Sequence, residues 1–171
     1  MSVTDERNVI LAVYNKHKIN EYSPEGQLIR EINLLLNSHI RFPSHALKLA
    51  NGHFVVSHGL GCDIMDRVCI VDADGKLMKS FREKRRPKGG HRTLPVHLSI
   101  DGSGSVLVVD QMNSRVLLLD SQLEFKREVL SKEKHTLRNP SRILMDDSCS
   151  QMLLADSKWN SGGRILKFQF C

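Results

Sequence analysis

The sequence has few aromatic residues, no paired cysteine motif and no long apolar segment. Aromatic residues make up 5% of the 171 residues, and no apolar run approaches the roughly 18 residues that a membrane-spanning helix needs. The N-terminal residues include acids where a secretory signal has bases. No membrane span and no export signal are therefore visible in the sequence, which predicts a cytoplasmic protein, with the nucleus as the alternative. The cysteines, at Cys62, Cys69, Cys149 and Cys171, form no C-x-x-C pair, which predicts thiols rather than a zinc cluster.

A repeat organises the chain. Segments that open with a base and continue as an apolar run begin at Lys18, Arg67, Arg115 and Arg164, about 48 residues apart. Upstream of the last three lie RFPSHALKLANGHFVVS, TLPVHLSIDGSGSVLVVD and RNPSRILMDDSCSQMLLAD. In each, a proline opens a short apolar strand, and a turn rich in Gly, Asn, Asp and Ser leads to a second strand. We therefore predict four short strands in each repeat unit.

The predicted fold is all-β, a single array of four-stranded antiparallel β-propeller blades over residues 1–171. Nearly continuous apolar runs such as SVLVVD and RVLLLD predict strands covered on both faces. The units span approximately 5–36, 40–81, 93–130 and 138–171. The first lacks an upstream strand and the last lacks a final one, which predicts two complete and two partial blades in an open or incomplete ring. The remaining blades would come from a longer chain or by association.

The third unit carries the sharpest motif, in the stretch LPVHLSIDGSGSVLVVDQMNSRVLLLDSQLEF. An aspartate ends one strand, and an asparagine and an arginine precede the next. Ser57 and Tyr14 stand at the aspartate position of the second and first units. We expect a structural role, in which the acid accepts N–H groups of the turn and the arginine forks onto a carboxylate. The motif residues are Asp110, Asn113, Arg115, Asp156, Arg164 and Arg67.

This motif resembles that of the NHL repeat family of β-propellers, and the resemblance covers nearly the whole chain. It implies a non-enzymatic platform that binds protein partners, as in RING or tripartite-motif ubiquitin ligases. Single-stranded RNA binding is one alternative. A metal-dependent lyase that uses histidines near the channel mouth is a second. The sequence contains no RING, B-box or coiled coil, so the catalytic part of such a ligase would lie elsewhere.

One segment, REKRRPKGGHR, holds most of the net charge of +6. It joins the second unit to the third, and we expect it on the same face as the loop that holds Lys158 and Trp159. Three interpretations of this segment stay open: a solvated loop, a contact with a protein and a contact with RNA. Its positive charge suits phosphates, but no aromatic residues that could stack on bases are interleaved with the basic ones. KRRPK also fits a nuclear signal by composition. The candidate binding residues here are Arg82, Lys84, Arg85, Arg86, Lys88 and Arg92.

Three residues at matching positions follow the prolines: His45, His97 and Arg142. They are predicted to line the channel mouth. Two imidazoles suggest a metal site, but zinc catalysis usually needs three protein ligands, and the third position is a cation. We therefore expect polar contacts or anion binding rather than a metal. No cofactor is predicted, and no nucleophile elbow, phosphate-binding loop or HExxH motif is present.

Overall fold

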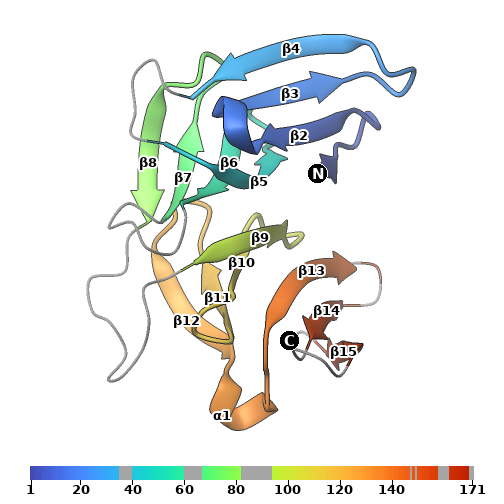
Figure 1. Cartoon of the computed structure of the whole chain (residues 1–171), viewed down its shortest axis with the longest axis vertical. Coiled ribbons are helices and arrows are strands. Elements are labelled where there is room, and N and C mark those ends of the chain that lie inside the picture. The colour runs from blue at the N-terminus through green and yellow to red at the C-terminus, as the bar shows by residue number, and fades with distance from the viewer. Residues whose placement is uncertain are drawn as a thin grey trace. The chain divides into compact units, whose positions relative to one another are not determined.

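The computed structural model describes residues 1–34, 40–59, 67–81, 94–146, 148, 150–157 and 162–169. Most of these residues lie in β-strands (Figure 1), and the chain divides into two compact units, Met1–Arg82 and Glu83–Cys171. Each unit holds two antiparallel sheets. Within the described residues, the single α-helix is α1 (Lys132–His135), and none is long and apolar enough to cross a membrane.

Unit 1 contains sheets I and II, whose strands pair in chain order. Sheet I is formed by β1 (Ser2–Val3), β2 (Val9–Val13), β3 (Lys18–Tyr22) and β4 (Leu28–Asn33), with the 3-10 helix η1 (Tyr14–Lys16) between β2 and β3. Sheet II is formed by β5 (Pro43–Lys48), β6 (Phe54–His58), β7 (Arg67–Val71) and β8 (Leu77–Phe81).

Unit 2 contains sheets III and IV, which follow the same order. Sheet III is formed by β9 (Pro95–Ile100), β10 (Val106–Asp110), β11 (Arg115–Leu119) and β12 (Phe125–Leu130). Sheet IV is formed by β13 (Pro140–Asp146), β14 (Gln151–Ser157) and β15 (Gly163–Gln169). Because neighbouring strands are antiparallel, the loop after each second strand lies at the same end of its sheet as the segment that leads into the first strand.

Sheet I has one strand more than the sequence predicted. β1 pairs Ser2 with Ile10 and Val3 with Val9, so sheets I, II and III each have four strands and sheet IV has three among the described residues. The expected count of two complete blades is corrected to three. A two-residue strand has no apolar period to detect, so the pairing with β2 is needed to reveal it.

The turns between strands repeat one hydrogen-bond pattern. The Oδ1 atoms of Asp72, Asp101 and Asp120 each accept the backbone N–H groups two and four residues later, at 2.8–3.0 Å. A short acidic side chain can supply such acceptors within its own turn, which is why aspartate favours turns. This local chemistry explains why the turn positions could be read from the sequence.

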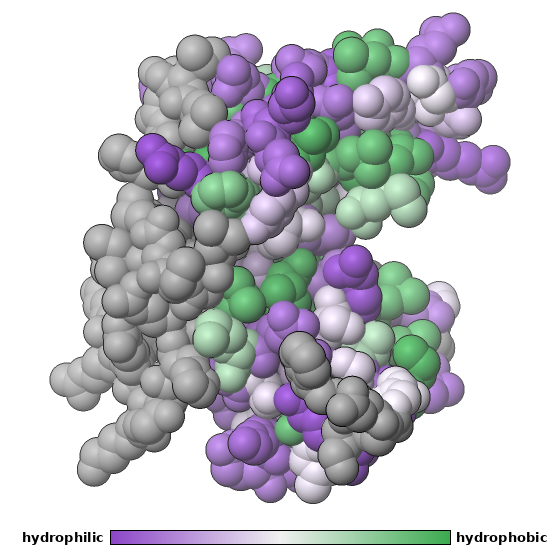
Figure 2. Space-filling model, viewed as in Figure 1, coloured by the Kyte–Doolittle hydropathy of each residue, from purple (hydrophilic) through white to green (hydrophobic). Residues whose placement is uncertain are grey.

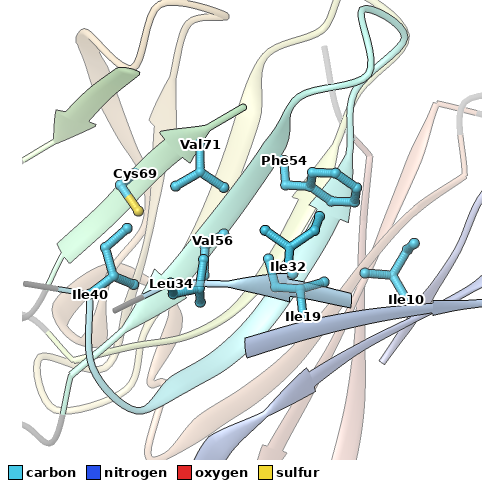
Figure 3. Packing of buried hydrophobic residues seen from close by; sticks show 10 residues of the cluster. Ile10, Ile19, Ile32, Leu34, Ile40, Phe54, Val56, Cys69 and Val71 are labelled. Carbon is cyan, nitrogen blue, oxygen red and sulfur yellow. The ribbon is translucent and has the colours of Figure 1, made fainter. Parts of the chain in front are cut away.

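The two sheets of each unit pack face to face through apolar side chains. In unit 1, Ile10 and Ile19 of sheet I meet Phe54 and Val56 of sheet II (Figure 3). In unit 2, side chains of β10 and β11 meet those of β13 and β14 in the same way. Burying one such side chain stabilises the fold by about 1.5–3 kcal/mol. On the visible face, apolar and polar residues are interspersed (Figure 2).

Two glycines with the same backbone conformation test how closely sheets I and II pack. Gly75 and Gly52 have φ angles of +83° and +82°. A Cβ on Gly75 would overlap the carbonyl oxygen of Asn33, whereas a Cβ on Gly52 would meet nothing within 4 Å. We expect Gly52→Ala to cost about 1 kcal/mol from the left-handed backbone alone, and Gly75→Ala about 3 kcal/mol because the overlap adds to it. Urea unfolding measures both, and equal costs would contradict the close packing.

Candidate functional site

A buried carboxylate holds the loop between β10 and β11. Asp110 has no exposed side-chain surface, and its Oδ2 accepts hydrogen bonds from Arg115 Nε and Asn113 Nδ2, both at 2.8 Å. Its Oδ1 accepts the backbone N–H of Leu94 at 3.0 Å. Both oxygens are therefore used, one by the loop and one by the segment that leads into β9. Charge-assisted bonds of this kind are about twice as strong as neutral ones.

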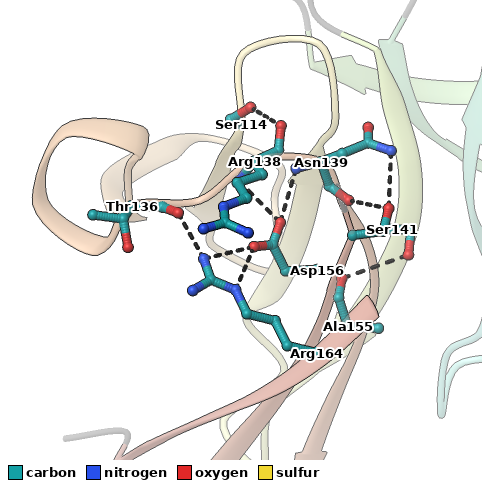
Figure 4. Close-up of polar contacts among 9 residues, drawn as sticks. Ser114, Thr136, Arg138, Asn139, Ser141, Ala155, Asp156 and Arg164 are labelled. Carbon is teal, nitrogen blue, oxygen red and sulfur yellow. Dashed lines mark hydrogen bonds and ion pairs between the residues drawn. The ribbon is translucent and has the colours of Figure 1, made fainter. Parts of the chain in front are cut away.

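Asp156 forms the equivalent contacts in sheet IV (Figure 4). Its Oδ2 accepts Arg164 Nε at 3.0 Å and Nη2 at 2.9 Å, and its Oδ1 accepts the N–H groups of Arg138 and Asn139 at 3.0 and 2.8 Å. Arg164 Nη2 also donates to Thr136 O at 2.6 Å. The Asp156 side chain is thus surrounded by donors, as the close-up shows.

The N–H groups that these acids accept differ from the expected ones. The sequence predicted the N–H groups of the loop after the second strand, but Leu94, Arg138 and Asn139 all precede the first strand of their sheets. The reason is the pairing, which sets Asp110 opposite Pro95 and Asp156 opposite Pro140. The lead-in segment therefore passes the carboxylate more closely than the loop backbone does.

A serine joins these two clusters. Ser114, in a left-handed conformation with φ of 50°, donates from Oγ to Arg138 O at 2.9 Å. The loop of sheet III and the segment before sheet IV are therefore held side by side. We call residues 111–114 and 136–139 the loop surface of unit 2. Met112, 39% exposed, and Arg138, also exposed, project from it.

Unit 1 uses a histidine at the position of Ser114. His17 has φ of 52°, and its Nδ1 accepts the backbone N–H of Phe42 at 3.0 Å. The ring of Phe42 lies edge-on to His17 at 4.9 Å and tilted against Tyr14 at 5.2 Å. The sequence analysis missed this contact because it joins residues 25 positions apart that no motif links.

The pairing also corrects two assignments by one residue. His58 lies opposite Pro43 and Arg67, as Asp110 lies opposite Pro95 and Arg115. His58, not Ser57, is therefore the counterpart of the aspartate in sheet II. In sheet I, Val13 lies opposite Lys18, so Val13, not Tyr14, is the counterpart.

The histidines predicted at the channel mouth contact the backbone. His45 is 2% exposed, and its Nε2 lies 3.0 Å from Met1 O, a carbonyl that can only accept, so Nε2 donates. The Nδ1 of His97 accepts the N–H of Ile143, at 3.4 Å. Arg142 is exposed on β13, and its Nη1 lies 3.4 Å from Ser141 O. His97 and Arg142 lie on packed strands of unit 2, and His45 lies in unit 1. Within the described residues, no group of three His, Cys, Asp or Glu side chains is placed to hold a metal.

Several candidate residues lie outside the described part of the chain. They are the side chain of Arg67 and all of Arg82, Lys84, Arg85, Arg86, Lys88, Arg92, Lys158 and Trp159.

A further buried acid, Glu21, joins sheets I and II. Its side chain is 1% exposed, and its Oε1 accepts hydrogen bonds from Lys48 Nζ at 2.7 Å and Asn8 Nδ2 at 3.0 Å. Arg30 Nε lies 3.8 Å from Oε2. Burial raises the pKa of Glu21, but the Lys48 and Asn8 hydrogen bonds and the two cations outweigh burial, so the pKa is lowered. The residue pattern of β2 and β3 in the sequence did not indicate this ion pair.

The comparisons with known proteins identify the fold. No protein-family model matches the chain, and no curated protein matches its sequence. Among solved structures, it is similar to virginiamycin B lyase from Staphylococcus aureus, with a TM-score of 0.63 and 13% identity over 98% of this chain and 54% of that one. It is also similar to a chain of a nidogen/laminin complex, with a TM-score of 0.69 and 11% identity over 95% and 57%.

The shared fold is that of a β-propeller. A form of the lyase solved with quinupristin has a TM-score of 0.65 at 13% identity, over 99% of this chain and 54% of that one. The chain spans about half the length of these solved chains. The likeness establishes all-β blades of the propeller type, a fold that hosts both an enzyme and a chain of a protein complex.

Replacing the acid of sheet III tests its structural role. Asp110→Asn keeps the shape but removes the charge, so the buried guanidinium of Arg115 retains only the more exposed carboxylate of Glu128, 3.5 Å from its Nη1. We expect a loss of about 3 kcal/mol in the free energy of unfolding. Asp101→Asn, in a turn of the same sheet, keeps its acceptor oxygen and should cost below about 0.5 kcal/mol. Similar costs in guanidinium unfolding would show that the Asp110 contacts add little.

The lowered pKa of Glu21 leads us to expect that the stability of the fold depends on pH. Because its folded pKa lies below the unfolded value of about 4.3, its ionised form contributes stability above that value, and the contribution is lost as pH falls through the folded pKa. We expect Glu21→Gln to cost about 3 kcal/mol at neutral pH and less in acid. Glu31→Gln, which removes an exposed ion pair with Lys18, should cost below about 1 kcal/mol at both. A Glu21→Gln cost independent of pH would contradict this account.

Proposed function

We propose that this chain is a non-enzymatic recognition module that binds a protein partner through the loop surface of unit 2. The observation that carries the proposal is the joining of the Asp110 and Asp156 clusters by Ser114, which fixes two loops side by side. Loops ordered before binding lose less conformational entropy when a partner docks. The exposed side chains there include Met112 and Arg138, and both residue types are enriched in protein interfaces.

The comparisons support this role at the level of the fold. One of the similar chains comes from a nidogen/laminin complex, so a propeller of this kind occurs in an assembly of proteins. We further propose that the blades are of the NHL type, on the Asp-x-x-Asn-x-Arg pattern of residues 110–115. The chain would then be the substrate-recognising part of a cytoplasmic ubiquitin ligase.

Two other functions have a specific observation in their favour. The cations of residues 82–92 suit the phosphates of single-stranded RNA. The likeness to virginiamycin B lyase suits an enzyme. Against the lyase function, His45 Nε2 forms a hydrogen bond with Met1 O, and this bond would have to break before the nitrogen could bind a metal. The protein-binding role needs no such change in the described residues.

Site-specific photo-crosslinking tests the proposed surface. A photoreactive residue at the position of Met112 should capture a discrete partner from cell extract, and Arg138→Glu should abolish the capture. The matched control places the same residue at Gln122, at the opposite end of β11, which should capture nothing specific. Equal capture from both positions would overturn the proposal.

Further arms separate the alternatives. In cells that carry Arg138→Glu, ubiquitination of the captured protein should fall if the ligase role is right, and unchanged ubiquitination would refute that role. Tight, strongly salt-dependent binding of a single-stranded RNA pool, lost when Arg85, Arg86 and Lys88 are changed to serine, would instead favour the RNA function.

A further inference from the structure

The segment between β12 and β13 carries exposed cations that have no ionic partner. In residues 131–139, Lys132, Lys134 and Arg138 are the strong bases, and Glu133 is the single acid. All three basic side chains are exposed. Within the described residues, none of the three forms an ion pair or a side-chain hydrogen bond. Cations gathered in this way without counter-charges create a positive potential that attracts anionic groups.

The strand order places this basic segment at the same end of sheet III as the loop surface. Because neighbouring strands are antiparallel, β12 ends at the end of the sheet where the loop between β10 and β11 lies. The opposite end of sheet III is formed by the turns 101–105 and 120–124, which contain three acids and no base. Sheet III is therefore flanked by positive charge at the loop surface and by negative charge at its other end.

Two guanidinium groups are presented from fixed positions at this end of unit 2. The N–H of Arg138 donates to Asp156 Oδ1 at 3.0 Å, and its carbonyl oxygen accepts Ser114 Oγ at 2.9 Å. Arg164 has a side chain that is 34% exposed, and its Nη2 donates to Thr136 O at 2.6 Å. In Figure 4 both guanidinium groups lie on the Thr136 side of Asp156. Groups fixed in this way bind carboxylates with a smaller loss of conformational entropy.

The other residues of the loop surface favour a protein over a nucleic acid. Residues 111–114 and 136–139 contain no aromatic residue on which bases could stack. Met112 is 39% exposed and lies on the loop that Ser114 joins to Arg138. A methionine side chain adapts to apolar partners of different shapes. A protein segment with carboxylates around an apolar side chain would complement both the cations and the methionine.

We propose that the partner of the loop surface presents an acidic segment, in which Asp and Glu residues surround an apolar side chain. Its carboxylates pair with Lys132, Lys134 and Arg138, and its apolar side chain packs on Met112. This inference rests on the proposed protein-binding function and specifies the chemistry of the partner. Complementary charge of this kind raises the rate of association and selects against basic partners. The acids at the other end of sheet III repel the same segment, which directs it to the loop surface.

The probe is a fluorescent eight-residue peptide of glutamates with leucines at its third and sixth positions. Titrated with the whole chain, it should show a saturable rise in fluorescence anisotropy. Its affinity should fall severalfold as the salt concentration rises from about 50 to about 300 mM, because salt screens exposed charges. A control peptide with glutamine in place of every glutamate should bind about tenfold more weakly. Equal affinities of the two peptides, or no saturable binding of the acidic peptide at low salt, would overturn the proposal.

Paired substitutions that remove equal charge distinguish a local contact from attraction to the net charge. Lys132→Gln combined with Lys134→Gln should weaken binding of the acidic peptide about fivefold, because two exposed ion pairs are lost. Lys126→Gln combined with Lys167→Gln removes the same charge from β12 and β15, outside residues 131–139. This second pair should leave the affinity nearly unchanged. Equal weakening by both pairs would show that only the net charge matters and would overturn the proposed site.

The photo-crosslink at the position of Met112 separates this inference from the proposed function. Loss of the captured partner on changing Lys132 and Lys134 to glutamine, but not Lys126 and Lys167, supports an acidic partner. Capture that Arg138→Glu abolishes and both lysine pairs leave unchanged would mean that the surface binds a protein that is not acidic. The function would then stand and this inference would fail. No specific capture would remove the function itself. A single-stranded RNA that binds more tightly than the acidic peptide, and loses affinity in the Lys132 and Lys134 variant, would overturn the choice of a protein.

Discussion

The fold depends on buried carboxylates that hold together chain segments distant in sequence. Asp110 and Asp156 each accept a guanidinium from the following strand and backbone N–H groups from the segment before their sheet. A carboxylate has about four lone-pair directions, and these two use several of them on different segments. Short strands with continuous apolar runs can slip in register, so these contacts fix the strands of sheets III and IV where apolar packing alone would not.

The sequence was informative wherever the cause of the structure was local. Strand runs such as residues 106–109 and turn acids such as Asp101 act within a few residues, and both appear in the structure as predicted. The four-unit repeat followed because local patterns recurred. β1 was missed because two residues carry no period. It is defined by its pairing with β2, and Ser2 Oγ also donates to Ala46 O, far along the chain.

The candidate site was harder to predict, because a site depends on which segments meet. The sequence motif identified Asp110, Asn113 and Arg115. The residues before β9 that Asp110 contacts follow from strand pairing and not from the spacing of the motif. A one-residue difference in register moved the counterpart in sheet II from Ser57 to His58. Ion pairs across sheets, such as Glu21 with Lys48, carry no sequence signature at all.

The contact made by Ser114 has a consequence for how substitutions combine. Ser114 Oγ donates to the carbonyl oxygen of Arg138, and the N–H of the same residue donates to Asp156. The backbone at Arg138 is therefore held by the loop of sheet III and by the carboxylate of sheet IV together. Residues that share a partner in this way do not contribute independently to stability, so the effects of changing Ser114 and Asp156 are coupled rather than additive.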